Sequence, residues 1–517
     1  MEKLHPIMFA GTGSDVGKSI IAAAFCRIFR QDGYHPAPFK AQNMALNSYA
    51  TPEGLEIGRA QAVQAEAAGV PCHTDMNPLL LKPSSDHTSQ VVLNGRPIGN
   101  RSAYEYFRVE GREELRHEVC SAFDRLASRY NPIVMEGAGS ISEINLRDTD
   151  LVNLPMALHA GADVILVGDI DRGGVFASVY GSLMLLHPYE RERIKGILIN
   201  KFRGDIRLFE SGVKMLEELC GIPVVGVVPY YKDIYIEEED SLALATKSVQ
   251  TEQGKVNIAV VLLRHLSNFT DFNVLERDPR VHLFYTNNVD ELAKADIILL
   301  PGSKSTLADL HELRRNGVAQ AVIRAHREGA TVMGICGGYQ IMGQEVCDPD
   351  HVEGEIERLP GLGLLPVSTH MTGEKITRQV RFHLTMDNGQ LTINATDSAA
   401  HSQLSTLNSQ LLQGYEIHMG TTVPVYDAPV SPLNLLEDGG ADGYFLDRTC
   451  MGTYIHGILD NPSFIDFLLE PFADKIADAG KSFDYHQFKE EQYNKLADHV
   501  RSHVDLPLIY KILTTHD

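Results

Sequence analysis

Long hydrophobic runs are missing from this sequence. Its most apolar stretches, residues 257–263 and 295–301, have the length of strands, whereas a membrane-spanning helix needs about 18 apolar residues. The first residues, MEKLHPIMFAGTGS, contain neither an apolar core nor a small-residue cleavage site, so we expect no secretory signal. The sequence therefore predicts a protein without a membrane partner.

Positive charge is also scarce. Lys and Arg total 46 against 68 Asp and Glu, which gives a formal net charge of −22. A nucleic-acid-binding protein needs a basic face to neutralise phosphates, so we expect no nucleic-acid partner. The seven cysteines include no CxxC pair. This argues against a disulfide framework or a zinc site and favours free thiols in the cytoplasm.

Low-complexity and Gly/Pro-rich segments are absent as well. The chain has 517 residues, of which 44% are hydrophobic and 22% charged, with 43 Gly and 24 Pro. These values lie near the averages of globular proteins and exclude a collagen-like or mainly disordered chain. At about 100–200 residues per domain, the length indicates two large domains, or two large domains with a small additional one.

Short apolar runs alternate with helix-like stretches in the N-terminal half. Candidate strands there cover residues 7–10, 133–135, 164–168, 196–199 and 224–228. Each run leads into a Gly- or Asp-containing turn and then into helical periodicity, which is typical of a doubly wound, mostly parallel α/β sheet. The pattern stops after residue 229, and the acidic, then polar residues 236–255 are predicted to be a linker.

The alternation restarts in the C-terminal half. Candidate strands there cover residues 256–263, 281–285, 297–300 and 330–335. They predict a second α/β sheet, while residues 362–394 are more typical of antiparallel strands. The expected segments are a first α/β domain at 1–235, the linker at 236–255, a second domain at 256–461 and a C-terminal helical segment at 462–517.

A phosphate-binding loop, GTGSDVGKS, follows the first predicted strand and precedes a predicted helix over 20–30. A Gly-rich turn at this place lets backbone N–H groups converge on a phosphate, and the helix dipole favours the anion. Lys18 is expected to reach the terminal phosphates of ATP, and the Ser19 hydroxyl to bind Mg²⁺. Thr12 occupies the place of the first Gly in the strict pattern. The predicted nucleotide-binding residues of this loop are Gly11, Thr12, Gly13, Val16, Gly17, Lys18 and Ser19.

Acidic residues end two other predicted strands of this half. Glu136 follows the second strand, where a further magnesium contact belongs in a P-loop protein. Asp169 and Asp171 follow the third strand, and Arg172 comes next. Because ligands of such sheets gather at the carboxyl ends of strands, the two Asp residues are candidate metal ligands and Arg172 a candidate contact for an anionic substrate.

A candidate nucleophile stands on a turn of the C-terminal half. The sequence GICGG at 334–338 follows a predicted strand and precedes a helix-like stretch over 339–345, as in a nucleophile elbow with Cys336 in place of serine. The N-terminus of a helix stabilises a thiolate. The N–H of Gly337, with a second donor from the loop around Gly302, is expected to bind an oxyanion. The other six cysteines are predicted to be structural.

A thiol nucleophile needs a base. His456 ends a later predicted strand and is the best candidate, and His418 is the next. A Cys–His site can release ammonia from a carboxamide through a thioester, and an ATP site can phosphorylate a carboxylate to give a leaving group for that ammonia. Together the two sites indicate glutamine-dependent amide synthesis. The alternatives are a P-loop switch ATPase and a Cys hydrolase with a nucleotide-binding regulatory half.

The sequence also resembles known families. The N-terminal half is similar to the dethiobiotin synthetase-like synthetases and the C-terminal half to the class I glutamine amidotransferases. The whole chain, from about residue 8 to about residue 461, resembles the cobyric acid synthase family of cobalamin biosynthesis. The segments that carry this resemblance are GTGSDVGKS, FKAQNMALNS, EIGRAQAVQAEAAGV, MNPLLLKP, EGAGSISEINL, DIDRGGVFAS, NKFRGD, PGSKST, GICGGYQIMG, GYEIHMG and YIHGILDN.

This resemblance implies a glutamine-hydrolysing carbon–nitrogen ligase that uses ATP and Mg²⁺. Its implied reaction is amidation of the b, d, e and g carboxylates of adenosylcobyrinic acid a,c-diamide, so glutamine, ATP and a corrinoid acid would be its small-molecule partners. The related cobyrinic acid a,c-diamide synthases share the two-domain plan and remain the alternative, with other glutamine-dependent ligases. The segments KAQNM, EIGRAQ and DIDRGGVFA favour the cobyric acid synthase family.

Residue roles follow from the same resemblance. Cys336 and His456 match the nucleophile and the base. Class I enzymes have a Glu two residues after this His, where the sequence has Ile458. Either a Cys–His dyad suffices or another residue, for which Glu416 is the candidate, orients His456. By position, Asn200 is expected to contact the nucleotide base. The candidate contacts of the corrin carboxylates are Lys40, Arg59, Lys82 and Arg172.

Overall fold

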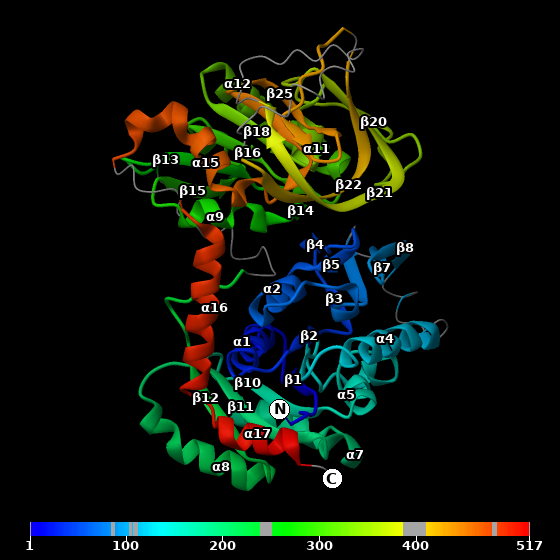
Figure 1. The fold of residues 1–517 in the computed structure, drawn as a ribbon, viewed down its shortest axis with the longest axis vertical. Coiled ribbons are helices and arrows are strands. Elements are labelled where there is room, and N and C mark those ends of the chain that lie inside the picture. Colours follow the sequence, from blue (N-terminus) through cyan, green and yellow to red (C-terminus); the bar gives the residue numbers. More distant parts are fainter. Residues whose placement is uncertain are drawn as a thin grey trace. The chain divides into compact units, whose positions relative to one another are not determined.

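The chain folds into two compact units. The computed structural model describes residues 2–83, 88–102, 106, 112–237, 251–385, 410–425, 427–477 and 483–515 (Figure 1). Unit 1 comprises Met1–Ala45, Leu55–Glu237 and Gln487–Asp517, and unit 2 comprises Leu46–Gly54 and Glu238–His486. The sequence predicts two continuous domains, whereas each unit also contains a segment from elsewhere in the chain. Most of the predicted linker, residues 238–250, lies outside the described residues.

Unit 1 is built on a six-stranded parallel sheet in the order β12-β11-β10-β1-β9-β2. Its strands are β1 (Ile7–Gly11), β2 (Ala37–Phe39), β9 (Ile133–Glu136), β10 (Asp163–Asp169), β11 (Ile194–Phe202) and β12 (Val224–Pro229). All five strands predicted for this half are present. The chain leaves β1 to one side for β2 and β9 and to the other for β10–β12, so the order reverses at β1, where ligands bind in such sheets.

The central strands of this sheet are buried on both faces. Every residue of β1 and β10 is buried, which explains why they read as unbroken apolar runs in the sequence. Helix α1 packs against β1 through aromatic rings, with the centroids of Phe9 and Phe25 4.8 Å apart. The helices of unit 1 that precede β12 are α1 (Lys18–Gln31), α2 (Arg59–Ala68), α4 (Arg112–Ala127), α5 (Leu154–Ala160), α6 (Val175–Met184), α7 (Pro188–Arg191) and α8 (Glu210–Cys220), with 3₁₀ turns η1 (Thr74–Met76), η2 (Ile144–Thr149) and η3 (Ile206–Phe209).

A second, smaller sheet of unit 1 was not predicted from the sequence. It has the order β3-β6-β7-β8, with β3 parallel to β6 and the other pairs antiparallel. Its strands are β3 (Gln42–Met44), β6 (Leu79–Pro83), β7 (Thr88–Leu93) and β8 (Arg96–Ser102), and β5 (Glu56–Gly58) lies between β3 and β6 in the chain. Several of these strands are short and polar, so their sequence shows little periodicity.

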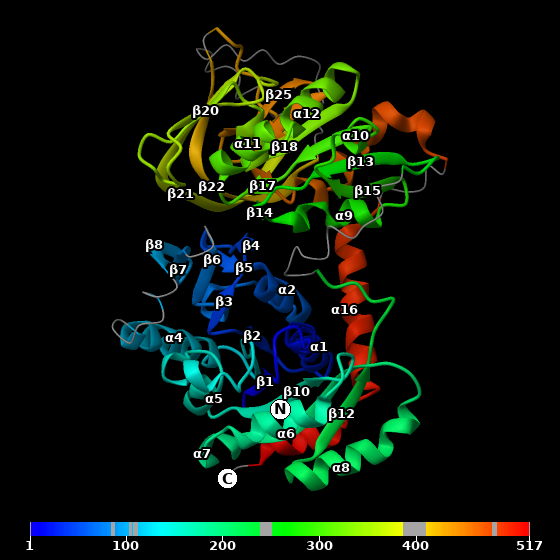
Figure 2. The ribbon, with the colours of Figure 1, turned by 180° about the vertical axis from the view of Figure 1, so that it is seen from behind.

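The C-terminal segment is helical, as predicted, and most of it belongs to unit 1. Helices α16 (Tyr485–Arg501), seen from both sides in Figures 1 and 2, and α17 (Leu506–Thr514) contact the first half of the chain: Arg27 donates to Asn494 of α16, and α17 packs against β12. The Tyr510 hydroxyl donates to Asp32 Oδ2 over 2.6 Å, and Arg501 forms an ion pair with the same carboxylate. These contacts join the C-terminal helices to unit 1.

Unit 2 contains a second six-stranded sheet in the order β15-β13-β16-β18-β26-β25, parallel except for the edge strand β25. Its strands are β13 (Val256–Val261), β15 (Val281–Thr286), β16 (Ile297–Leu300), β18 (Thr331–Ile335), β25 (Tyr444–Asp447) and β26 (Cys450–Thr453). The α/β fold class with two mostly parallel sheets is therefore confirmed. The helices of this unit are α9 (Asn273–Arg277), α10 (Val289–Leu292), α11 (Thr306–Arg315), α12 (Val318–Arg327), α13 (Gly337–Met342) and α15 (Pro462–Leu469), with 3₁₀ turns η5 (Phe269–Phe272), η8 (Ile458–Asp460) and η9 (Glu470–Lys475).

Antiparallel strands also occur where the sequence predicts them. Strands β21 (Val367–Leu384) and β22 (Leu412–Pro424) form a long antiparallel pair, while residues 386–394 of the predicted segment lie outside the described part of the chain. The remaining strands are β4 (Ser48–Ala50), β14 (Leu266–Ser267), β17 (Gly302–Ser303), β19 (Glu345–Cys347), β20 (Arg358–Pro360), β23 (Asn434–Leu436), β24 (Ala441–Asp442) and β27 (Ile455–His456). Strand β27 pairs with β22, which brings His456 beside Tyr415.

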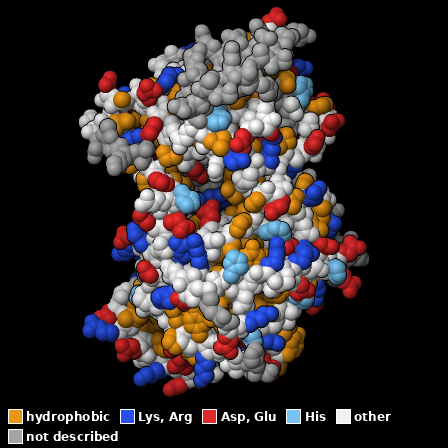
Figure 3. Space-filling model, in the orientation of Figure 1, with side chains coloured by type: hydrophobic (Ala, Val, Ile, Leu, Met, Phe, Trp, Pro, Cys, Tyr) orange, Lys and Arg blue, Asp and Glu red, His pale blue; other side chains and the backbone are white. Residues whose placement is uncertain are grey.

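Charged side chains of both signs are interspersed with hydrophobic ones over the face drawn in Figure 3. Among the residues that the structure describes, no helix combines the length and apolar character needed to cross a membrane.

Candidate active sites

Cys336 occupies a sharp turn at the carboxyl end of β18. Its backbone has φ 53° and ψ −112°, a region that non-glycine residues rarely adopt. The neighbouring glycines permit the turn, because a Cβ atom on Gly338 would lie 1.9 Å from the Leu300 carbonyl oxygen. Helix α13 begins directly after the thiol and ends at Met342, earlier than predicted, because Gly343 is extended and β19 begins at Glu345.

Two backbone segments flank the thiol of Cys336. The backbone N–H of Cys336 donates to the carbonyl of Thr453 over 2.8 Å, which holds the turn against β26. A Cβ atom on Gly337 would lie 2.7 Å from the backbone nitrogen of Ser303, so the loop after β16 passes directly beside the elbow. The same loop reaches the base, because a Cβ atom on Gly302 would lie 3.4 Å from Cε1 of His456. The segments predicted to bind an oxyanion therefore lie together.

His456 is buried between Cys336 and a carboxylate. Its Nδ1 lies 2.7 Å from Oδ2 of Asp271, and Oδ1 of Asp271 accepts the N–H of Gly457 over 3.1 Å. Burial alone would lower the pKa of His456, but the charges of Asp271 and Cys336 and hydrogen bonds to both side chains raise it to about 10. The imidazole is therefore protonated near neutral pH, which favours a thiolate on Cys336.

Asp271 is the functional residue that sequence reasoning missed. The candidate considered there, Glu416, instead forms an ion pair with Arg378, with 2.7 Å between Oε2 and Nε. Strand β22 directs the Glu416 side chain to this partner, so it does not orient His456. Asp271 lies on η5, 185 residues before His456, in the sequence NFTDF, which carries no motif signal. Its burial, with 4% of its surface exposed, is visible only in the fold.

The other titratable groups near this site have different roles. His418 stacks on the ring of Tyr454 with centroids 3.7 Å apart. Burial lowers the pKa of His418 to about 3, so its imidazole is neutral and is not an ion-pair partner for Cys336. Burial raises the pKa of the thiol of Cys450 to about 12 and that of Cys347 to about 11, in keeping with structural roles.

The predicted phosphate loop joins β1 to α1. Gly17 has φ 95° at the N-terminus of the helix, and Lys18 Nζ donates to the carbonyls of Gly13 and Gly139, each over 2.9 Å. Gly11 leaves room for this lysine, because a Cβ atom there would lie 2.8 Å from Nζ. The Lys18 ammonium is thus held over the loop, where it can bind phosphate.

Asn200 supports the same loop from the end of β11. Its Nδ2 donates to the carbonyl of Val16 over 2.8 Å, and a Cβ atom on Gly17 would lie 2.2 Å from this nitrogen. Thr12, the departure from the strict loop pattern, donates its N–H to the carbonyl of Val167 over 3.1 Å. The loop is therefore hydrogen-bonded to β10 through Thr12 and to β11 through Val16.

Glu136 lies beside Ser19 at the end of β9. The Ser19 hydroxyl donates to Oε1 over 2.8 Å, Gln64 donates to Oε2 over 2.7 Å, and Lys40 Nζ lies 2.8 Å from Oε1. Although burial would raise its pKa, Lys40 and these hydrogen bonds lower the pKa of Glu136 below its usual value, so the group is a carboxylate. A hydroxyl and a carboxylate oxygen are ligands that Mg²⁺ prefers, so Ser19 and Glu136 fit the metal.

The other predicted ligand-binding residues are engaged in ion pairs. Lys40, Arg59 and Lys82 are buried, and each contacts a glutamate. Their partners are Glu136, Glu237 and Glu56, respectively. Asp169 pairs with Lys201 and Asp171 with Arg203. Arg172 is exposed and lies 3.5 Å from Asp15 of the phosphate loop. Of these basic residues, Arg172 has its head group most open to solvent.

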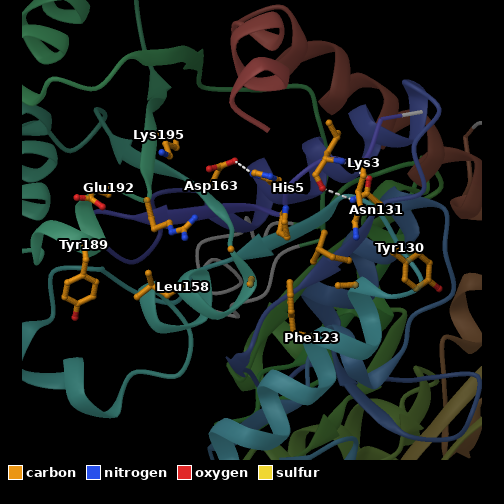
Figure 4. Close-up of a pocket in the computed structure, with 17 residues that line it drawn as sticks. Lys3, His5, Phe123, Tyr130, Asn131, Leu158, Asp163, Tyr189, Glu192 and Lys195 are labelled. Atoms are coloured by element: carbon orange, nitrogen blue, oxygen red, sulfur yellow. Dashed lines mark hydrogen bonds and ion pairs between the residues drawn. The ribbon is translucent and has the colours of Figure 1, made fainter. Parts of the chain in front are cut away.

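A cavity of about 860 Å³ in unit 1 lies away from these residues. His5 and Asp163 form an ion pair in it, as Figure 4 shows, and Lys195 also lines it. These residues stand at the amino ends of β1, β10 and β11, opposite the phosphate loop. Because parallel sheets of this kind bind ligands at the carboxyl ends of their strands, we do not assign the reaction to this cavity.

Comparisons with known proteins agree with the two sites. Residues 7–243 match the family described as the CobQ/CobB/MinD/ParA nucleotide binding domain, and residues 257–464 match the CobB/CobQ-like glutamine amidotransferase domain. The protein is therefore an enzyme in which a P-loop nucleotide-binding domain is fused to a glutamine amidotransferase domain.

Relatives of the full length narrow this class to one family. The chain is 81% identical over 516 residues to a cobyric acid synthase of Bacteroides fragilis and 73% identical over 516 residues to one of Phocaeicola vulgatus, covering 100% of both chains in each case. It is 47% identical over 532 residues to one of Syntrophobacter fumaroxidans, covering 99% of each. The chain belongs to the cobyric acid synthase family, whose members are glutamine-dependent ligases of cobalamin biosynthesis.

Proposed function

We propose that this enzyme amidates the b, d, e and g carboxylates of adenosylcobyrinic acid a,c-diamide, with one glutamine and one ATP consumed at each step. The observation that carries the proposal is the presence of two complete and chemically different sites in one chain. One is the buried Cys336–His456–Asp271 arrangement, and the other is the phosphate loop with Lys18 and Glu136. Neither site alone makes an amide from a carboxylate with glutamine as the nitrogen source. We place this reaction in the cytoplasm.

The first site releases ammonia from glutamine. The Cys336 thiolate attacks the carboxamide carbon, and the N–H groups at Gly337 and Gly302 stabilise the oxyanion. His456 then gives its proton to the departing nitrogen, so that NH₃ and a thioester form. Water attacks the thioester while the neutral His456 takes a proton. Collapse of this second tetrahedral intermediate releases glutamate and restores the thiolate and the imidazolium.

The second site activates the corrin carboxylate. A carboxylate oxygen attacks the γ-phosphorus of ATP, the bond to the β-phosphate oxygen breaks, and an acyl phosphate and ADP form. Lys18 neutralises charge on the transferring phosphoryl group. Bound Mg²⁺, held by Ser19 and Glu136, would supply further neutralisation of phosphate charge. Ammonia then attacks the acyl carbon and displaces inorganic phosphate, which leaves the amide.

The remaining predicted contacts belong to the same proposal. We place the nucleotide base near Asn200, because this residue adjoins the phosphate loop at the carboxyl end of β11. Arg172 is the favoured contact for a corrin carboxylate because its side chain is exposed near the phosphate loop. Lys40, Arg59 and Lys82 can contribute positive potential from their buried ion pairs. Direct contacts by these three would require the pairs to open.

Mass spectrometry of the corrinoid tests this proposal. The enzyme is incubated with ATP, Mg²⁺, glutamine and adenosylcobyrinic acid a,c-diamide, and each carboxylate-to-amide step lowers the mass by about one dalton. Four steps are expected. Two steps on adenosylcobyrinic acid and none on its a,c-diamide would instead identify a cobyrinic acid a,c-diamide synthase. Because one ATP site serves four carboxylates, we also expect partially amidated intermediates in solution at early times with excess substrate.

A further inference from the structure

The turn that carries Asp271 is held by a short piece of the N-terminal half of the chain. Residues Leu46–Gly54, here called the insert segment, belong to unit 2, although the residues on either side of them belong to unit 1. The segment contains β4 and includes Leu46, Asn47 and Ser48, the last three residues of FKAQNMALNS, to which the two reaction mechanisms give no role. The contacts of its Asn47, Ser48 and Tyr49 with Phe269, Asn268 and Tyr415 lie around the catalytic histidine rather than the phosphate loop.

The first contact fixes the start of η5, the turn that bears Asp271. The side-chain amide of Asn268 binds the backbone of Ser48 at both ends: the Ser48 N–H donates to Oδ1 over 3.1 Å, and Nδ2 donates to the Ser48 carbonyl over 3.2 Å. Asn47 Oδ1 accepts the N–H of Phe269 over 3.3 Å. Asn268 has φ 52°, so the turn begins from a left-handed residue that these bonds hold in place.

The second contact fixes the aromatic ring that covers His456. The rings of Tyr415 and His456 are stacked with centroids 5.3 Å apart and planes 21° apart. The ring of Tyr49, in the insert segment, packs against the ring of Tyr415, with centroids 4.6 Å apart. Asn268 Nδ2 also lies 3.3 Å from the Tyr415 hydroxyl, and Ala50 is buried in the same cluster. The insert segment thus supports both the turn that carries Asp271 and the ring of Tyr415 that stacks on His456.

We propose that the insert segment completes the glutaminase site and that Asn47 and Asn268 are positioning residues for the His456–Asp271 pair. The proposal rests on the proposed function, in which His456 carries and transfers the proton. A carboxylate 2.7 Å from an imidazole fixes its tautomer and orientation only while both groups are held to within a fraction of an ångström. Loosening η5 would lengthen this contact and reduce the charge stabilisation of the imidazolium without removing any reacting group.

A merely structural role would have a different signature. If the insert segment only filled space, its loss would lower stability and affect all activities of the folded fraction alike. A positioning role lowers kcat for glutamine, leaves KM for glutamine nearly unchanged, and moves the pH profile, because the proton affinity of His456 depends on Asp271. Ammonia-dependent synthesis should be unaffected in both the rate and the pH profile.

The experiment compares three variants of the full-length enzyme. Asn47→Ala removes the bond to Phe269. Asn268→Gly keeps a residue that tolerates positive φ but removes the amide that binds Ser48. Glu53→Ala is the matched control, because Glu53 lies exposed in the same segment. Each variant is assayed with glutamine and with ammonium salt from pH 6 to 10, and its Cys336 is alkylated with iodoacetamide over the same range.

The expected result is a loss of about tenfold to a hundredfold in glutamine-dependent kcat for Asn47→Ala and Asn268→Gly. In both variants the alkaline limb of kcat/KM should shift to lower pH, whereas alkylation of Cys336 should require higher pH, because a weakened imidazolium stabilises the thiolate less. Their ammonia-dependent rates should stay within about twofold of that of Glu53→Ala. Profiles and rates equal to those of Glu53→Ala would overturn the proposal. A wild-type enzyme that amidates the corrinoid with neither nitrogen source would instead overturn the proposed function, independently of the variants.

Discussion

The carboxylate of Asp271 lies 2.7 Å from Nδ1 of His456, and both side chains are almost fully buried. This contact supplies the third member of the glutaminase site, which the sequence did not reveal because Ile458 occupies the place of the usual Glu. The carboxylate that contacts His456 therefore comes from η5 and not from position 458, two residues after the histidine. An acid at either place can fix the tautomer of the histidine and stabilise its protonated form.

Replacing Asp271 by Asn should lower glutamine-dependent kcat roughly a hundredfold, because the negative charge that stabilises the imidazolium is lost. The pH profile should also change in a defined direction. Because the pKa of His456 is raised to about 10, wild-type activity is expected to decline above about that pH as the imidazolium is lost. Without the charge of Asp271 the pKa falls, so the alkaline limb of kcat/KM should move to lower pH.

Glu416→Gln is the control for this variant. It removes another buried carboxylate of unit 2, which pairs with Arg378 and not with His456. Its alkaline limb should stay close to that of the wild type. An Asp271→Asn profile that coincides with the Glu416→Gln profile would contradict the assignment of Asp271.

Cys336→Ser should abolish glutamine-dependent synthesis while leaving synthesis from ammonia near normal. A serine hydroxyl is far less acidic than a thiol, so it does not replace the thiolate in attack on the carboxamide. The measurement is amide formation with glutamine and, separately, with ammonium salt at high pH, where free NH₃ is abundant. Cys347→Ser is the matched control, because the Cys347 thiol donates a hydrogen bond to Glu345 and lies outside the site. Loss of both activities in a folded Cys336→Ser enzyme would place Cys336 in the synthetase chemistry.

Lys18→Ala should abolish amide synthesis from either nitrogen source. Lys18 is held over the phosphate loop by the carbonyls of Gly13 and Gly139, and the charge on the phosphates grows during transfer. The assay is ADP release and amide formation with ammonia, which bypasses the glutaminase site. Lys214→Ala, an exposed lysine on α8, provides the control. Retained synthesis with ammonia would show that this loop does not hold the reacting nucleotide.

The fold could be predicted largely because its central strands are buried on both faces. Strands such as β1 and β13 consist of fully buried runs, so their apolar character marks them without knowledge of their neighbours. The phosphate loop and the Cys336 elbow were equally visible, since each function depends on consecutive residues at a strand-to-helix turn. Motifs of this kind can be recognised from a few consecutive residues.

The rest depends on contacts between distant residues. Asp271 and His456 are 185 residues apart, and nothing in the sequence around Asp271 marks its partner. The insert segment has the same character, because short strand β4 carries no periodic pattern and its role lies in backbone bonds to Asn268. The return of α16 and α17 to unit 1 likewise rests on contacts between distant residues, such as Tyr510 with Asp32 and with the ring of Phe29. Sequence patterns indicate elements, but not these partnerships.

The pairing of Glu136 with Lys40 predicts that a single substitution will have two separable effects. In Glu136→Gln, Lys40 loses a carboxylate partner 2.8 Å away in a buried position, which typically costs about 3–5 kcal/mol. The thermal midpoint of this variant should therefore fall. The double variant Glu136→Gln/Lys40→Met removes the uncompensated charge as well, so its midpoint should recover toward that of the wild type.

Nucleotide binding distinguishes the catalytic part of the Glu136 role from this structural part. The carboxylate and the Ser19 hydroxyl are 2.8 Å apart and fit a magnesium ion, so binding of a fluorescent ATP analogue to the wild type should tighten when Mg²⁺ is added. This tightening should be lost in Glu136→Gln and should stay lost in the double variant, even though its stability recovers. Lys40→Met alone keeps the carboxylate and should keep the response to Mg²⁺. If the double variant responds to Mg²⁺ as the wild type does, Glu136 is a structural partner of Lys40 and not a metal ligand.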